Sequence, residues 1–355
     1  MIVLRMRKLI IASVLLGIFA IAFSVAVALL SPSGGHVIPP DEPDEAPSAT
    51  EPPKERHQAL DINDSKMIIR FLQGGEIHDI SMYDYLTGAV AAEMPAVFEP
   101  DALAAQAVAL RTYVLHHILI APSELHAGAD VCGDFGCCAA FCDEATLREK
   151  WGAEFEANIK RVKDAVFQTD SVYITYESVP ILAVFHSSSH RATTGAEKVW
   201  SKPVPYLVGV PSPETEEEVE NLKSTVTITT SDFKSTILSV YPDAVFGDDA
   251  RAWISEMRQD TSGRVDTIVI GGVTMTGPQL RALFMLRSTA VSITIGDDIV
   301  FETMGYGHGV GMSQYGANIM AKSGVAWRYI IKSYYTGVAF SDESSDKALG
   351  AAVVM

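Results

Sequence analysis

Positive charge and cysteine are both scarce in this chain. Its 355 residues hold 27 lysines and arginines against 44 aspartates and glutamates, so the formal net charge is −17. No long basic run interrupts this excess, and such a chain repels nucleic acid and anionic membrane surfaces. No segment repeats at a fixed period, which argues against a repeat architecture. The composition favours a neutral or cationic substrate, or a polar sugar polymer.

A long apolar stretch without charge runs from Leu9 to Leu30. As a helix it would span a hydrocarbon core of about 30 Å. Arg5, Arg7 and Lys8 precede it, which predicts a cytoplasmic N-terminus and an extracytoplasmic remainder. A cleaved signal peptide ending near residues 26–28 is the alternative. The run exceeds the ~7–15 apolar residues of a signal core, which favours a retained anchor.

The rest of the chain divides by composition. Residues 1–30 would form a cytoplasmic stub and the transmembrane anchor. Proline and acidic residues dominate residues 31–63, which predicts a flexible linker without a core. We expect one folded domain over residues 64–341 and a tail over residues 342–355.

Apolar spacing in the folded part alternates between the periods of strands and helices. Strands and glycine-containing hairpins are expected at residues 67–72, 77–80, 172–176, 181–185, 225–229, 265–270, 273–275, 291–295 and 299–303. Helices are expected from residue 82 to a pause at 94–95, from residue 100 onward, at 151–168, from about 231 onward, and at 276–284, 312–321 and 327–334. This mixed order predicts an α+β fold of helices and β-hairpins.

Glu93 is a single carboxylate among small and apolar neighbours between Tyr85 and Pro95. Loss of hydration would raise its pKa, as a proton donor to a glycosidic oxygen requires near neutral pH. Pro95 should end the helix and leave Glu93 at its end, facing a cleft. The alternative is a glutamate in a cap or ion pair, which the spacing alone favours.

Other polar residues are candidates for substrate binding. Gln106 and Arg111 could bind sugar hydroxyls and Tyr113 could stack on a sugar, although Arg111 could instead pair with a carboxylate and Tyr113 could be packing. The segment after residue 185 suggests a polar cleft edge at His186, Ser187 and Ser188 rather than a serine hydrolase triad. Alternating glycines in residues 305–316 allow close approach of the backbone to a ligand and offer three further cleft-lining groups, His308, Gln314 and Tyr315.

All four cysteines fall in one short segment: Cys132, Cys137, Cys138 and Cys142. Two disulfides are possible outside the cytoplasm, but each would close only a small loop. Free thiols are a further possibility. Cysteines with a nearby His126 are typical of a tetrahedral zinc site, with His126, Cys132 and Cys138 as ligands and Cys137 or Cys142 as the fourth.

Several segments together resemble the stage II sporulation protein D family, lytic transglycosylases of engulfment in endospore-forming bacteria. They are YLTGAVAAEMPAVFEPDALAAQAVALRTYVL at 85–115, FHSSS at 185–189, VWSKPVPYLVGVPSP at 199–213, LRST at 286–289 and GYGHGVGMSQYGA at 305–317. The resemblance covers about residues 67–340. After Ser189 this chain continues with His190 and Arg191, where many members have two glycines.

The resemblance implies a function and its residues. Glu93 would be the single catalytic carboxylate, cutting between N-acetylmuramic acid and N-acetylglucosamine of peptide-stripped strands to leave 1,6-anhydro ends. A structural zinc would be held by His126, Cys132, Cys137 and Cys138. Partners would be the sporulation amidase P and the membrane protein M, with the domain outside the mother-cell membrane and facing the forespore. A hydrolytic muramidase and a non-catalytic, glycan-binding amidase enhancer are the alternatives.

Overall fold

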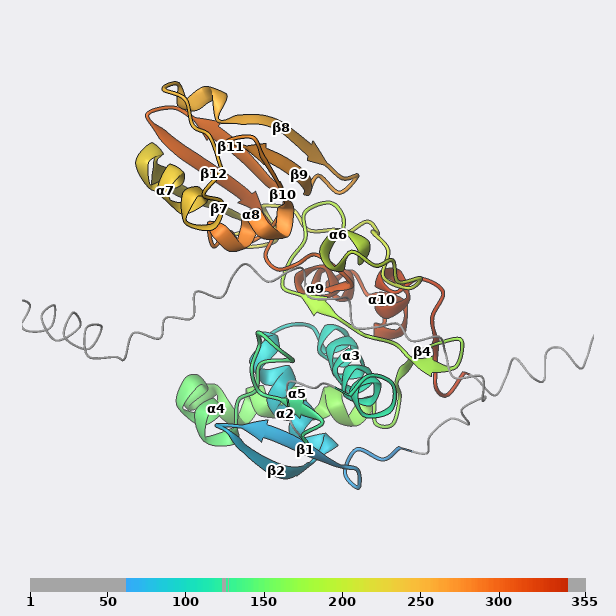
Figure 1. Ribbon diagram of the computed structural model, residues 1–355. Coiled ribbons are helices and arrows are strands. Elements are labelled where there is room, and N and C mark those ends of the chain that lie inside the picture. The colour runs from blue at the N-terminus through green and yellow to red at the C-terminus, as the bar shows by residue number, and fades with distance from the viewer. Residues whose placement is uncertain (1–61, 123–125, 127, 344–355) are drawn as a thin grey trace, which may run out of the picture. The chain divides into compact units, whose positions relative to one another are not determined.

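The computed structural model describes residues 62–122, 126 and 128–343, in which helices are mixed with small sheets (Figure 1). The α+β prediction is confirmed. The expected anchor, nearly all of the linker and most of the tail lie outside the described residues. None of the helices within the described ranges is long and apolar enough to cross a membrane.

The domain begins with a hairpin, as predicted. β1 (Ile68–Gln73) and β2 (Glu76–Ser81) pair antiparallel. Gly74 and Gly75 turn between them with positive φ, which is accessible to glycine without strain. β3 (Val131–Cys132) adds to β1 in parallel, which places Cys132 beside Leu72. The cysteine segment is thereby attached to this sheet.

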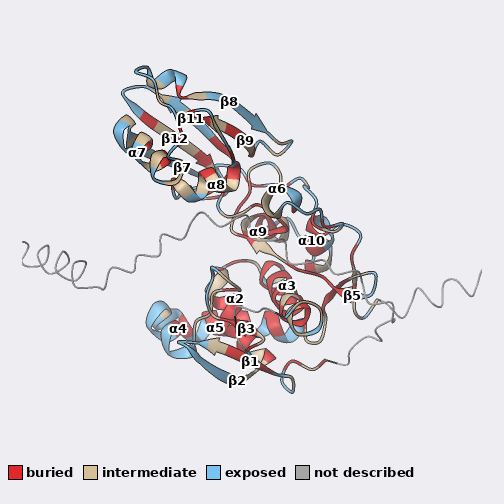
Figure 2. Cartoon of the chain, in the orientation of Figure 1, coloured by how far each residue is buried: buried red, intermediate tan, exposed pale blue. Residues whose placement is uncertain are grey.

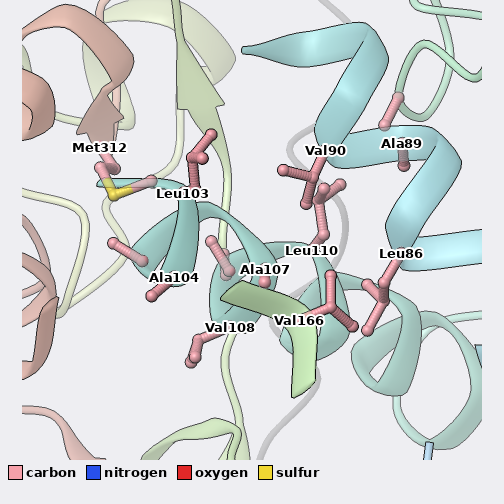
Figure 3. Close-up of a cluster of buried hydrophobic side chains, with 14 of the residues drawn as sticks. Leu86, Ala89, Val90, Leu103, Ala104, Ala107, Val108, Leu110, Val166 and Met312 are labelled. Carbon is pink, nitrogen blue, oxygen red and sulfur yellow. The ribbon is translucent and has the colours of Figure 1, made fainter. Parts of the chain in front are cut away.

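Three helices form the centre of the first hydrophobic core: α2 (Met82–Glu93), α3 (Pro100–Leu119) and α5 (Phe155–Gln168). α3 is buried on nearly all sides (Figure 2), as expected of a helix that is apolar around its circumference. In Figure 3, side chains of α2, α3 and α5 meet in one cluster with Met312 nearby. The many alanines of α3 let the helices pack closely.

α2 ends where the sequence predicts. Met94 is extended, with φ −121° and ψ 144°, and Pro95 follows. The prediction for residues 151–168 needs revision, because α5 begins at Phe155 after a 3₁₀ turn at Gly152–Glu154. α4 (Glu144–Trp151) was not predicted. It buries only Leu147, so its sequence carries little apolar periodicity.

The short strands after α5 and the C-terminal strands and helices form a further region beside α3. β4 (Ile174–Tyr176), β5 (Val179–Pro180) and β14 (Ala339–Phe340) form one small sheet, and β6 (Phe185–His186) pairs with β13 (Met312–Ser313) in parallel. α6 (Glu197–Trp200), α9 (Gln314–Lys322) and α10 (Trp327–Tyr334) complete this region.

The strand predicted at residues 181–185 is wrong except at Phe185. The backbone amide of Leu182 donates to the Tyr206 hydroxyl, at 3.1 Å, instead of to a neighbouring strand. A side chain that lies elsewhere in the fold therefore replaces the ladder that the local pattern suggested.

A second hydrophobic cluster lies in residues 223–304. Two sheets build it, β10-β9-β8 and β11-β12-β7. Their strands are β7 (Lys223–Thr229), β8 (Ile254–Gln259), β9 (Val265–Ile270), β10 (Val273–Thr276), β11 (Val291–Ile295) and β12 (Asp298–Met304), with helices α7 (Thr230–Val240) and α8 (Gly277–Leu283) and a 3₁₀ turn at Ala250–Ala252. Both predicted hairpins are confirmed, and Thr276 begins α8 with a capping box. β8 was not predicted, because its residues are mostly exposed.

Candidate active site

Glu93 is the last residue of α2, and two donors hold its half-buried carboxylate. The Ala140 amide donates to Oε1 at 2.7 Å, and the Gln314 side chain donates to Oε2 at 3.3 Å. Burial raises the pKa of Glu93, although both hydrogen bonds act in the opposite direction. The predicted elevation of this pKa is confirmed. A carboxyl group in this environment keeps its proton to higher pH than an exposed glutamate does.

The glycine-rich segment brings Gln314 to Glu93 across 221 positions of sequence. At Gly311, φ is +70°, and an added Cβ would lie 2.1 Å from the Val184 carbonyl oxygen. Glycine at this position therefore lets β13 pair closely with β6. The Ser313 side chain then caps α9, of which Gln314 is the first residue.

Tyr315 extends the same edge of the site. Its ring packs edge-on against Phe98, with centroids 5.0 Å apart, and its backbone amide donates to the Ser187 carbonyl at 3.0 Å. Ser187 and Tyr315 are both half-buried. The structure thus joins three of the predicted cleft residues, Gln314, Tyr315 and Ser187, to the region of Glu93.

His186 and His308 lie in the two segments that form this edge, and both rings are neutral. His186 Nδ1 donates to the Val310 carbonyl at 3.1 Å, so Nε2 accepts from the Ser189 hydroxyl at 2.7 Å. His308 Nε2 donates to the Phe185 carbonyl at 3.0 Å and Nδ1 accepts from the Val310 amide. Burial lowers both pKa values, that of His308 to about 4. Ser189 is 0% exposed, so the His186–Ser189 pair cannot act on a polymer in this conformation.

Three predicted substrate contacts are buried, and a fourth, the half-buried Tyr113, takes part in packing. Arg111 is 0% exposed and forms a buried ion pair with Asp64, with Nε 2.8 Å from Oδ1, so the alternative of a carboxylate partner holds. Gln106 is also fully buried, and neither amide atom has a partner in the described residues. Ser188 is buried against the Tyr306 backbone. The Tyr113 ring packs on His117, and its hydroxyl donates to the Cys137 carbonyl at 3.3 Å.

The buried pair predicts a large loss of stability when Arg111 is replaced. Arg111→Met should lower the free energy of unfolding by about 3–5 kcal/mol, because it leaves the Asp64 carboxylate buried without its partner. Denaturant unfolding measures this change. Arg258→Met, which removes an exposed ion pair with Glu256, should leave the unfolding free energy nearly unchanged. Equal losses in the two variants would contradict the structural role of Arg111.

A second cluster lies next to Glu93. The ligand atoms of His126, Cys132, Cys137 and Cys138 all lie within 4.8 Å of one another. His126 Nε2 is 3.0 Å from Cys137 Sγ and 3.4 Å from Cys138 Sγ. Ligands of a tetrahedral zinc with bonds of about 2.0–2.3 Å would be about 3.5–3.8 Å apart, so this donor set fits the metal. All four cysteines are free thiols, and Cys142 lies outside the group.

The cysteine segment and Glu93 are mechanically linked. Two residues after Cys138, the Ala140 amide holds the Glu93 carboxylate. The segment then lies directly on α2: the Cys142 amide donates to the Gly88 carbonyl at 3.3 Å, and a Cβ at Gly88 would lie 2.3 Å from the Phe141 ring. A change in the cluster would therefore move a hydrogen-bond donor of Glu93.

Known proteins resemble this chain over much of its length. Residues 73–176 match the SpoIID family model, described as Stage II sporulation protein. Stage II sporulation protein D of Bacillus subtilis (strain 168) is 36% identical over 269 residues, which cover 75% of this chain and 76% of that protein. The chain belongs to the SpoIID family. Stage II sporulation protein D of Bacillus amyloliquefaciens is 34% identical over 271 residues, 76% of each chain.

Another relative is an amidase enhancer and not a stage II sporulation protein D. The amidase enhancer of Bacillus subtilis (strain 168) is 26% identical, with 72% of this chain covering 40% of that protein. The SpoIID model match includes Glu93 and the four clustered ligands, whereas the glycine-rich segment lies beyond it. The recognised resemblance to this family is thus confirmed, and the chain is a sporulation protein of the SpoIID family.

The sequence reasoning missed Glu214, which supports the site in this SpoIID chain. Its carboxylate is 3% exposed and accepts hydrogen bonds from the Ser189 amide, at 2.8 Å, and from the Ser313 hydroxyl. Ser313 caps α9, so Glu214 fixes the start of the helix that carries Gln314. The only signal was its position directly after the VWSKPVPYLVGVPSP segment. Ala140 acts through its backbone, for which a sequence offers no signal.

Proposed function

We propose that the chain is a lytic transglycosylase that cleaves the bond between N-acetylmuramic acid and N-acetylglucosamine in glycan strands. One observation carries the proposal: a lone carboxyl group with a raised pKa, held between the Ala140 and Gln314 donors. The groups that shift this pKa include no second carboxylate in the described part of the chain. Ordinary glycosidases need two carboxylates.

A substrate hydroxyl can replace the second carboxylate. Glu93 would donate its proton to the glycosidic oxygen as the bond from C1 to that oxygen breaks. The resulting carboxylate would take the proton of the muramic acid C6 hydroxyl while that oxygen bonds to C1. The product is a 1,6-anhydro end, no water is consumed, and Glu93 is protonated again. The Ala140 and Gln314 donors would stabilise the carboxylate between the two proton transfers.

We also propose that His126, Cys132, Cys137 and Cys138 hold a structural zinc ion. The distances among these donors support it. Such an ion would fix the cysteine segment against α2 and so keep the Ala140 amide on Glu93. From the family resemblance we propose an extracytoplasmic, membrane-anchored location, with the sporulation amidase P and the membrane protein M as partners.

Gln314→Ala tests the role of Glu93 as an acid. The Gln314 hydrogen bond lowers the pKa of Glu93, so its removal should raise that pKa further. Because the donor must be protonated, activity falls as pH rises through this pKa. The alkaline limb of the pH–rate profile should therefore move to higher pH. The exposed Gln168→Ala should leave it in place, and an unmoved or lowered limb in Gln314→Ala would contradict the assignment.

A non-catalytic role is the second candidate, because a relative is an amidase enhancer. Incubation of the purified chain with peptide-free glycan, without any amidase, separates the two functions. We expect soluble fragments to be released. If fragments appear only when an amidase is added, and its rate rises with the chain present, the enhancer role is correct instead.

A further inference from the structure

A pocket of about 420 Å³ lies beside the glycine-rich segment. It is lined by residues of α8, the loop that follows α8, Val199, Tyr306 and His308. Three of the segments that carry the family resemblance contribute to it, at residues 199, 286–289 and 306–308. Nothing in the proposed proton transfers uses this pocket.

Two arginines in this pocket lack an acidic partner. Arg281 is half-buried and donates through Nε to the Leu286 carbonyl at 3.1 Å. Arg287 donates through Nη1 to the Asn221 carbonyl at 3.3 Å and lies over the Tyr306 ring, 5.4 Å from its centroid. Neither forms an ion pair with a carboxylate in the described ranges. In a chain with a net charge of −17, two unpaired guanidinium groups in one pocket indicate an anion site.

The remaining lining restricts the ligand further. His308 is neutral and its ring nitrogens are already bonded, so it adds no charge. Val199, Pro278 and Met285 supply apolar surface, and Met285 is 88% exposed. The pocket therefore suits a carboxylate attached to a small apolar group better than a bare inorganic anion, because part of its wall offers no hydrogen bond.

We propose that Arg281 and Arg287 bind the lactyl carboxylate of N-acetylmuramic acid in strands that have lost their stem peptides. This inference rests on the proposed substrate. The lactyl group joins a carboxyl to a methyl-bearing carbon, which matches the two kinds of wall. When a stem peptide is attached, that carboxyl is an amide and carries no charge. The arginines would therefore distinguish stripped from peptide-bearing muramic acid.

One strand can reach both sites. His308 and Gln314 are six positions apart, so the chain between them spans at most about 22 Å. Gln314 contacts Glu93. A strand held by its carboxylate at the arginines would thus be bound within a few sugar units of the proton donor.

Binding measurements on the Glu93→Gln protein test the inference without cleavage of the ligand. We expect peptide-free glycan to bind about tenfold more tightly than a chito-oligosaccharide of equal length, which has the same backbone without lactyl groups. Adding Arg281→Gln and Arg287→Gln should remove that tenfold preference and leave chito-oligosaccharide affinity within about twofold. The exposed Arg251→Gln, a matched loss of charge in the same region, should change neither affinity.

Three outcomes would overturn the inference. The first is an unchanged preference for peptide-free glycan in the double variant, and the second is an equal loss of affinity for both ligands. The third is that inorganic phosphate displaces peptide-free glycan as effectively as stripped muramic acid does. Failure here and failure of the proposed function are distinguishable. Cleavage by the wild-type chain decides the function, whereas these affinities decide the role of the two arginines.

Discussion

Replacing Glu93 with glutamine is expected to slow glycan cleavage by about 10²- to 10⁴-fold, the usual contribution of a general acid. Glutamine keeps the size of the side chain and can still bond to its neighbours, but it has no proton to donate. Fragment release from peptide-free glycan measures the rate. Binding of the strand should persist, because the change removes one proton rather than a contact surface.

Glu99→Gln is the matched control for this change. Glu99 lies six residues further along, at the start of α3, and its side chain makes no capping hydrogen bond. Cleavage by Glu99→Gln should remain close to that of the wild type. If the two variants lost activity equally, or if Glu93→Gln kept its activity, the carboxyl of Glu93 would not be the proton donor.

Loss of the metal site should have the second largest effect. Cys138→Ser is expected to reduce bound zinc from about one ion per chain and to lower cleavage by about 10- to 100-fold. The reason is the short connection from Cys138 to Ala140, whose amide holds Glu93. Metal analysis, the melting temperature and the cleavage rate should be measured on the same preparation. We expect the melting temperature to fall as well.

Cys142 provides the control within the same segment. It lies outside the four-ligand group, so Cys142→Ser should keep its zinc and most of its activity. A chelator should reproduce the Cys138→Ser effect in the wild type and add nothing to that variant. A chain that is fully active and equally stable without zinc would contradict the proposed link between the cluster and Glu93.

Local signals predicted much of the fold because they act over a few residues. Gly74 and Gly75 specified the first hairpin, Pro95 set the end of α2, and Thr276 capped α8. Segments with little apolar spacing, such as α4 and β8, gave no such signal. The strand expected at residues 181–185 failed because the Leu182 amide bonds to the Tyr206 side chain instead of to a neighbouring strand.

In the candidate site, too, local sequence signals predicted some features and missed those that depend on distant residues. The raised pKa of Glu93 and the grouping of His126 with three cysteines followed from residue types in a short span. Arg111 was misassigned, since its partner Asp64 lies 47 positions away and no local pattern connects them. The Gln314 contact, the Ala140 amide and the Glu214 support depend on tertiary packing, which spacing along the chain does not encode.

Mass spectrometry of the fragments released from peptide-free glycan tests the central claim most directly. Wild-type chain should give strands that end in 1,6-anhydro-muramic acid, and Glu93→Gln should give almost none. Fragments with reducing muramic acid ends, formed with uptake of water, would contradict the account and indicate a hydrolase.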